Sequence, residues 1–436
     1  MSAWRPKEII IHEKVRNDPV TNHVIEQCPG IPVKYIDNGI PKKIVECSEI
    51  LRNSGNSMLD KIIAGKQVLY IAPATHVVDV FTMPDDRIIC PHFDRLKLAS
   101  NGCFYQCDWC YLKLTYRAAF PFITIRAQYD KIKEQIHKRL SQTSEPVIFN
   151  TGELADSLSM EHLTRAAQEF IPWVANSENG YLFMLTKSDN VDDILDLYHN
   201  NRAIIAWSMN NAEVSKKYEI GAPPFERRLK AAEKVQKAGY PIRIRIDPII
   251  PFQGWQEAYA ETIKTIFSTI SPERVTLGTL RFEEGFYNMR KTIFTSGPDL
   301  PKFMEEMESM FPPKLFSGMK KTKSGKYSFN EDKRTEIFGF IIKEIEAVLK
   351  NLRSSSRSRR IGMVNHRNSV PISRIEHLDP TLRLGVRGGF ETASTEMFKL
   401  PPLALCKESP NVWKKLDLPL SKCSCVCQLD FADMSQ

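Results

Sequence analysis

The sequence contains three closely spaced cysteines, Cys103, Cys107 and Cys110, within the stretch CFYQCDWCY. Thiolates at this C-x3-C-x2-C spacing can bind three irons of a [4Fe–4S] cluster, because cysteine is the usual ligand of such clusters. Three protein ligands leave the fourth iron open to a chelating small molecule. In the same way, catalytic zinc sites keep one coordination position open, whereas structural zinc sites do not. The alternatives are a chance grouping and a zinc site, but the nearest histidine, His92, fits no familiar zinc spacing. The triplet therefore predicts a cluster with one vacant corner.

A second group of cysteines lies near the C-terminus, where Cys423, Cys425 and Cys427 form a C-x-C-x-C pattern. Side chains at i and i+2 of an extended segment share a face, so the sulfurs would form a row suited to soft ligands. Three interpretations stay open: a second metal or auxiliary Fe–S cluster, a site for a thiophilic substrate such as trivalent arsenic, or a redox or zinc tail without catalytic function. The other cysteines are expected to be small core hydrophobes; they are Cys28, Cys47, Cys90 and Cys406.

The composition is that of an ordinary globular chain, with 436 residues, 42% hydrophobic and 26% charged. A chain of this length can bury a core without disulfides. Its net charge of +8 permits an anionic substrate or nucleic acid, although a basic surface also aids solubility. No apolar run is long enough to span a membrane, and the N-terminus lacks the apolar core of a secretory signal. We therefore expect a cytoplasmic protein with reduced thiols and no membrane partner.

Short β-type runs alternate with helical patterns from about residue 86 to 285, which predicts a parallel sheet with right-handed crossovers. The expected strands are 88–90, 146–150, 181–186, 203–208, 242–247 and 274–280. The expected helices are 123–140, 160–171, 190–199, 224–240 and 256–270. Six such units indicate an α/β fold, a partial (β/α)6 barrel with the cluster at the carboxyl edge of its strands.

Five regions are expected along the chain. An N-terminal extension that packs on the core occupies 1–85, and the barrel occupies 86–285. A helical C-terminal extension follows at 286–350. The basic, low-complexity stretch NLRSSSRSRR (351–360) favours a flexible linker, and the Cys-bearing tail occupies 361–436.

The C-x3-C-x2-C motif followed by an aromatic residue resembles the radical S-adenosylmethionine (SAM) superfamily. The stretches NTGELADSLSMEHL (150–163), LTKSDNVDDIL (185–195) and DPIIPFQGW (247–255) look like the spore photoproduct lyase branch, and the likeness covers roughly residues 45–350. The resemblance implies that SAM binds the open iron through its amino and carboxylate groups. One electron, from a donor such as flavodoxin or ferredoxin, then splits a C–S bond and releases a carbon radical, usually 5′-deoxyadenosyl.

The resemblance also implies roles for residues around the cysteines. The backbone of Trp109 would lie near the adenine, and Tyr111 would belong to a hydrogen-transfer relay, although it could simply pack. Thr151, Gly152 and Glu153 match the position that binds the SAM amino group, where glycine permits close approach.

Further cofactor contacts are expected after the later strands. Lys187 would pair with the SAM carboxylate, as suits a cation at a sheet edge. Ser208 and Asn210 could bind the methionine or ribose, or else cap a helix. Arg245 and Arg243 lie on the same face of their expected strand. They are expected either to bind the cofactor and substrate or to form a buried ion pair with Asp247.

The chain departs from the spore photoproduct lyase pattern in one important respect. That family keeps a hydrogen-donor cysteine after the second barrel strand, but here no cysteine lies between Cys110 and Cys406. Repair of thymine lesions is therefore not the favoured activity, and a small-molecule substrate near the tail cysteines is preferred over nucleic acid. Some arsenic-modifying radical SAM enzymes transfer the 3-amino-3-carboxypropyl group of SAM to arsenite, and the tail resembles theirs loosely. The alternatives are that transfer, a DNA photoproduct lyase, and a non-catalytic Fe–S or zinc protein.

Overall fold

The largest element of the protein is an eight-stranded sheet, whose central strands are almost entirely buried. The computed structural model describes residues 3–55, 58–80, 93–110, 112, 122–283, 319–321, 326–359 and 403–404. Six strands of the sheet are parallel and adjacent in chain order. They are β5 (Asp94–Leu96), β8 (Val147–Asn150), β9 (Gly180–Thr186), β10 (Ala203–Ser208), β11 (Ile242–Ile249) and β12 (Arg274–Thr279). The predicted partial (β/α)6 barrel is thus confirmed. At the sheet's edges, β4 (Val78–Asp79) pairs antiparallel with β5, and β16 (Leu403–Ala404) pairs parallel with β12.

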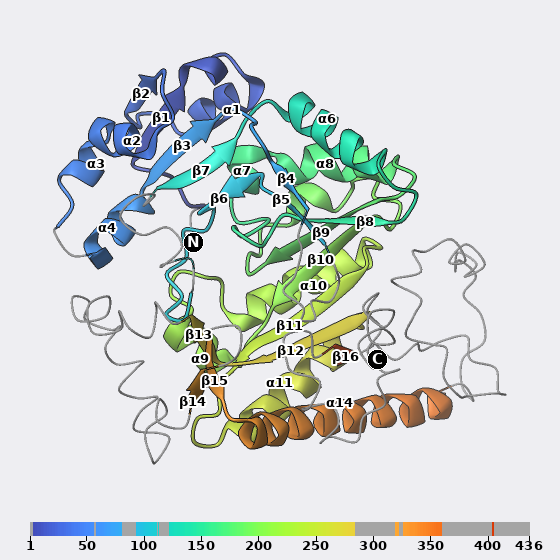
Figure 1. The fold of residues 1–436 in the computed structure, drawn as a ribbon. Helices are drawn as coiled ribbons and strands as arrows, with labels where there is room; N and C mark the ends of the chain where they lie inside the picture. The colour runs from blue at the N-terminus through green and yellow to red at the C-terminus, as the bar shows by residue number, and fades with distance from the viewer. Residues whose placement is uncertain are drawn as a thin grey trace, which may run out of the picture.

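Amphipathic helices cover the outer side of this barrel sheet (Figure 1). The long ones are α6 (Tyr129–Leu140), α8 (Ala166–Ala175), α10 (Phe225–Lys237), α11 (Trp255–Thr269) and α14 (Glu331–Arg359), and the short ones are α7 (Glu161–Thr164) and α9 (Ala212–Tyr218). Their buried side chains form one core with those on the outer face of the strands, including Trp207 and Ile244. Burial of this apolar area is the main stabilising force of the barrel. A smaller apolar cluster, with Phe93, Ile148 and Phe183, lies on the inner face of the sheet.

A second, five-stranded sheet forms the N-terminal part of the molecule. Its order is β2 (Val33–Ile36), β1 (Glu8–His12), β3 (Val68–Ala72), β7 (Ile123–Arg126) and β6 (Ala99–Ser100). The helices of this region are α1 (Pro19–Gln27), α2 (Pro41–Cys47), α3 (Glu49–Arg52) and α4 (Met58–Gly65). Because β6 and β7 complete this sheet, the expected boundary at residue 85 does not separate two structural units. The three-cysteine loop therefore follows one strand of this sheet, β6, and precedes another, β7.

Several predicted elements differ in the structure. Residues 123–126 form a strand rather than the start of a helix, because the alternating Ile-Thr-Ile favours a pleated, half-buried surface. The predicted helix 190–199 is reduced to one 3-10 turn, Asp192–Ile194. The first barrel strand is β5, and the expected strand 88–90 lies outside the described residues. The region 286–350 also contains the strands β14 (Met319–Lys321) and β15 (Lys326–Phe329). They form a small antiparallel sheet with β13 (Arg281–Glu283), which lies just before this region.

The prediction of a flexible linker at 351–360 is also wrong for residues 351–359, because α14 continues to Arg359. The buried residues Ile337, Ile341 and Ile345 pack this helix into the barrel core. Once a helix is nucleated by such packing, extending it by another residue is inexpensive, and arginine is a good helix former. No helix in the described part of the chain is both long enough and apolar enough to cross a bilayer.

Candidate active site

The three-cysteine loop, residues 101–110, is fixed by backbone hydrogen bonds to two barrel loops. Gln106 N donates to the carbonyl of Ile220 at 2.8 Å, and Asp108 N donates to that of Tyr218 at 2.9 Å. On the other side, Asp156 N donates to Gly102 O at 3.0 Å. The loop is therefore held between the segment after β8 and the segment after α9.

Gly102 is required where the loop passes the segment after β8. A Cβ atom at this position would lie 2.4 Å from Ala99 Cβ and 2.9 Å from Ala155 Cβ. Both contacts are far inside van der Waals distance, so only glycine allows this close approach. The sequence signal Asn101-Gly102 before the first cysteine thus reflects close packing of the loop.

The three cysteines are free thiols that influence one another electrostatically. Burial raises the pKa of the Cys103 thiol, and negative charge on Cys107 or Cys110 raises it further. Burial likewise raises the pKa of Cys107, to about 12. Metal binding would therefore have to displace protons from thiols that favour the neutral form without metal.

The donor set of the loop fits a [4Fe–4S] cluster, because cysteine thiolates are the usual ligands of such clusters. Zn–S bonds of about 2.3 Å require all ligands to converge on one point. Among the described residues, no three His, Cys, Asp or Glu side chains converge in this way. The cysteines of a [4Fe–4S] cluster instead bind three different irons and lie farther apart.

Lys66 brings a buried positive charge to the three-cysteine loop from the N-terminal sheet. It lies between α4 and β3, is 6% exposed, and donates a hydrogen bond from Nζ to the carbonyl of Tyr105. This positive charge opposes the upward pKa shift of Cys103. Within the described residues Lys66 has no carboxylate partner, so a negatively charged cluster would be its natural counterion.

Lys187 lies on the opposite side of the loop, directly after β9, as predicted. Its Nζ is 3.8 Å from Glu219 Oε1. Burial alone lowers the pKa of the Lys187 ammonium, but Glu219 and the Cys107 thiol raise it by more, so the net shift is upward. Glu219 also forms a 2.5 Å ion pair with Arg228, and both side chains are fully buried. Lys187 is thus a protonated amine held beside the second cysteine.

Asp156 ties the segment after β8 to the end of β9. Its Oδ1 accepts hydrogen bonds from Thr186 Oγ1 at 2.6 Å and from Ser159 N at 2.9 Å, and its Oδ2 accepts from Lys187 N at 2.6 Å. Several donors thus satisfy both oxygens of this buried carboxyl group. Asp156 therefore positions both Lys187 and the segment that contacts the three-cysteine loop.

The predicted Thr151-Gly152-Glu153 segment follows β8, as expected for a site at the carboxyl edge. A Cβ on Gly152 would lie 2.6 Å from Leu185 O, so the segment packs directly on β9. Thr151 Oγ1 bonds to Ser157 Oγ at 2.7 Å, which ties its hydroxyl to the same loop. Glu153 is partly exposed, whereas Thr151 is engaged within the loop.

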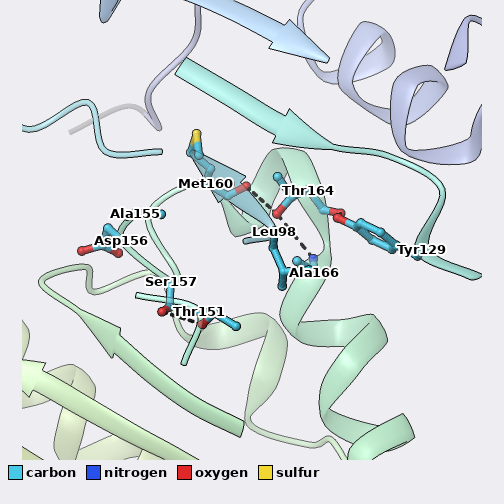
Figure 2. Close-up of a pocket in the computed structure, with 10 residues that line it drawn as sticks. Leu98, Tyr129, Thr151, Ala155, Asp156, Ser157, Met160, Thr164 and Ala166 are labelled. Carbon is cyan, nitrogen blue, oxygen red and sulfur yellow. Dashed lines mark hydrogen bonds between the residues drawn. The ribbon is translucent and has the colours of Figure 1, made fainter. Parts of the chain in front are cut away.

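A small cavity beside Thr151 has room for about one or two water molecules, with a volume of about 30 Å³. Figure 2 shows Thr151 and Ser157 on one side of it and Tyr129, at the start of α6, on the other. Its wall also includes Asp156 and Met160. Binding sites for drug-sized ligands are roughly ten times larger, so this cavity is not the SAM site.

Ser208 and Asn210 follow β10, and the structure uses them differently. Ser208 is buried at the strand's carboxyl end, and its carbonyl accepts from Arg228 Nη1 at 3.1 Å. Asn210 donates to Pro248 O at 2.8 Å and accepts from Tyr259 at 2.6 Å. The Asn210 amide thus joins β10, β11 and α11, and its role as a cofactor contact stays a prediction.

The arginines of β11 are not paired with Asp247, which was the alternative expectation. Arg243 Nε bonds to Glu273 at 2.5 Å, and Asp247 Oδ2 bonds to Arg281 at 2.8 Å. Arg245 is 8% exposed and has no side-chain hydrogen bond or ion pair within the described part of the chain. The inner face of β11 therefore carries a buried cation without a counterion.

Trp109 packs on the barrel core, and its ring centroid lies 6.1 Å from that of Tyr218 in an edge-on arrangement. This contact anchors the third-cysteine end of the loop. The remaining predicted catalytic residues lie outside the described residues; they are Tyr111, Cys423, Cys425 and Cys427.

Sequence reasoning missed four residues that position the site, namely Lys66, Asp156, Glu219 and Arg228. Arg228 gave a signal, since it lies on the same helix face as Ala232 and Val235, where a charge needs a buried partner. Lys66 is likewise a lone lysine between an apolar helix and an apolar strand. Nothing local could have identified their partners, which are distant in sequence.

Comparison with known proteins gives one consistent result. A family model described as spore photoproduct lyase matches residues 92–353. Spore photoproduct lyase of Geobacillus sp. (strain Y412MC61) is 30% identical over 185 residues, which are 42% of this chain and 53% of that protein. The protein of the same name from Bacillus subtilis (strain 168) is 33% identical over 161 residues, 37% of this chain and 47% of that protein. These matches thus span about half the length of both relatives.

Longer matches exist at lower identity. Spore photoproduct lyase of Clostridium acetobutylicum is 22% identical over 347 residues, 78% of this chain and 95% of that protein. A solved spore photoproduct lyase complexed with dinucleoside spore photoproduct shares the fold, with a TM-score of 0.64, 22% identity, and coverage of 79% of this chain and 96% of that one. A doubly substituted form with bound AdoMet and the same dinucleoside has a TM-score of 0.63 at 22% identity, covering 80% of this chain and 97% of that one. None of the matches described here is an arsenic-modifying enzyme or a transferase.

Proposed function

The chain belongs to the spore photoproduct lyase family, and on that premise we propose that it is a radical SAM enzyme acting on a modified pyrimidine dinucleotide. The observation that carries the proposal is the three-cysteine loop, fixed at the carboxyl edge of six parallel strands with Lys187 beside Cys107. Active sites of barrel folds are found at this edge. The relatives, which are spore photoproduct lyases, favour a nucleic-acid lesion over the small-molecule substrate expected from sequence.

The chain's own residues would bind both cofactors. Cys103, Cys107 and Cys110 would hold the cluster, and Lys187 would receive the SAM carboxylate as a charge-assisted partner. The bound cluster supplies the electron that splits a C–S bond of SAM. Glu153 would accept from the SAM amino group, and the Ser208 hydroxyl would face the methionine or ribose. Flavodoxin or ferredoxin would serve as the electron donor.

A lyase of this family must also return a hydrogen atom to its product. Because this chain has no cysteine between Cys110 and Cys406, that hydrogen must come from another group. Tyr111, directly after the third cysteine, is our first candidate. Cys423, Cys425 and Cys427 are the second, and their use as a separate metal or arsenic site has no support from the relatives.

The proposal is tested with protein reconstituted anaerobically with iron and sulfide. With SAM and dithionite, we expect 5′-deoxyadenosine, measured by chromatography, and its formation should require the cluster. An oligonucleotide that carries spore photoproduct should be converted to the undamaged sequence, whereas an undamaged oligonucleotide serves as control. Intact SAM despite a full cluster would refute the proposal, and 5′-methylthioadenosine would instead indicate transfer of the 3-amino-3-carboxypropyl group.

Lys66 should raise the reduction potential of the cluster. Reduction adds one negative charge, which a buried neighbouring cation stabilises in the reduced form. For Lys66→Met we expect a midpoint potential about 60 mV lower, a tenfold change in the ratio of reduced to oxidised cluster. The measurement is a redox titration followed by EPR. Lys61→Met on α4, where the side chain is partly exposed, is the matched control, and equal midpoints for the two variants would show that Lys66 has no such effect.

A further inference from the structure

The inner face of the barrel sheet is apolar on one side and cationic on the other. On β8, β9 and β10 it carries Ile148, Phe183 and Ala206, which belong to one buried cluster. Arg243 is in register with Ala206, and its guanidinium lies 5.7 Å from the Phe183 ring centroid. Because alternate residues of a strand share a face, Arg245 points to this same inner side.

The acidic residues near this face do not neutralise both arginines. Glu273 bonds to Nε of Arg243, but Nη1 and Nη2 of that arginine are buried and have no hydrogen-bond partner among the residues that the structure describes. Asp247 is held by Arg281, and Gly278 makes room for this pair, since a Cβ there would lie 2.7 Å from the Asp247 carboxyl group.

Arg245 is the unpaired cation of this group. It is 92% buried, counted from its 8% exposure, and makes no side-chain hydrogen bond or ion pair with any described residue. Its register partners are Ser208 on β10 and Thr276 on β12, both buried hydroxyl residues. In register with Arg243, β12 carries a further buried arginine, Arg274. A buried charge without a partner is costly, so its persistence points to an anionic ligand.

We propose that Arg245, with Thr276 beside it and reinforced by Arg243, binds the phosphate group of the substrate. A guanidinium presents paired N–H donors that match a phosphate oxygen pair, and the Thr276 hydroxyl supplies a further donor. The SAM carboxylate could offer similar oxyanion chemistry. However, its proposed partner Lys187 lies beside Cys107 after β9, two strands away from β11. The choice of a dinucleotide as substrate rests on the proposed function, whereas the oxyanion site does not.

The test uses full-length, reconstituted protein without dithionite, so that binding is measured without turnover. The probes are thymidylyl-(3′→5′)-thymidine, the same dinucleoside with an uncharged formacetal linker, inorganic phosphate, and SAM, each by calorimetry. For Arg245→Met we expect the Kd of the phosphodiester to rise at least tenfold, while those of the uncharged analogue and of SAM change less than threefold. Arg245→Lys should recover part of the affinity. Glu273→Gln, which releases Arg243 from its carboxylate, should tighten phosphate binding.

Thermal unfolding of each variant shows whether it is folded, and Glu273→Gln keeps the test decisive if Arg245→Met does not fold. An increased Kd for SAM with unchanged phosphodiester binding would assign Arg245 to the cofactor and overturn the inference. Wild-type protein that binds neither inorganic phosphate nor the dinucleotide would overturn it as well, even with SAM cleavage intact. Phosphate binding through Arg245 in a protein that never cleaves SAM would refute only the proposed function.

Discussion

Replacing Cys107 with alanine should leave a folded protein that no longer holds its iron–sulfur cluster. Cys107 is the most buried of the three candidate ligands, and a cubane held by only two thiolates loses the anchor in the middle of the loop. We expect nearly complete loss of bound iron and of the brown chromophore after reconstitution, together with loss of SAM cleavage. Removing one buried sulfur should cost on the order of 1 kcal/mol of folding stability, because the backbone bonds of Gln106 and Asp108 remain.

The matched control is Cys47→Ala, at the end of α2 in the N-terminal sheet region. Its thiol is partly buried, and its pKa is raised by burial in the same direction as that of Cys107. This variant should retain full iron content. If Cys107→Ala kept as much iron as Cys47→Ala in a side-by-side reconstitution, the loop would not be the cluster site.

The barrel could be predicted because its central strands are recognisable one at a time. Buried parallel strands are continuous apolar runs, as in β9 and β10, and β10 is followed by a polar segment and by the helices α9 and α10. The cysteine spacing is equally local. The N-terminal sheet could not be predicted, because β7 pairs with β3 across more than fifty residues of chain, and no local pattern encodes that partner.

The same distinction applies to the site. Lys187 and Ser208 could be placed because Lys187 directly follows β9 and Ser208 ends β10, and the carboxyl ends of parallel strands meet at one edge. The bonds of Asn210 to Pro248 and Tyr259 could not be predicted, since they depend on how β11 and α11 fold back. Charged residues on an apolar face, such as Arg228, are visible in sequence, but their partners are set by tertiary packing.

Substituting Arg228 with methionine should destabilise the protein by about 3–5 kcal/mol, the usual cost of leaving one partner of a buried ion pair alone. Glu219 would remain buried, and among the described residues its remaining ion-pair partner would be Lys187, at 3.8 Å. The carbonyls of Pro223 and Ser208 would also lose their guanidinium donors, at 2.6 and 3.1 Å. Urea unfolding measures the change. Because Glu219 lies between Tyr218 and Ile220, whose carbonyls hold the three-cysteine loop, cluster occupancy should fall as well.

The neighbouring residue provides the control. Arg227 forms an ion pair with Asp189, but its side chain is 44% exposed, so Arg227→Met should cost no more than about 1 kcal/mol. Equal stability of the two variants would mean that the Arg228–Glu219 pair is not an effective buried interaction. The pair also has a consequence beyond stability, because Glu219 is the anion that keeps Lys187 beside Cys107.

A double variant separates these two contributions. Replacing Arg228 with methionine and Glu219 with leucine removes both buried charges, and apolar replacements of this kind often restore stability. Lys187, however, loses the carboxylate that orients it, and its ammonium then has no fixed position from which to receive the SAM carboxylate. We therefore expect unfolding free energy near the wild-type value but SAM affinity reduced at least tenfold, measured by calorimetry on the reconstituted protein. Recovery of both together would show that the pair serves the fold alone, whereas recovery of stability without affinity identifies Glu219 as the residue that positions Lys187.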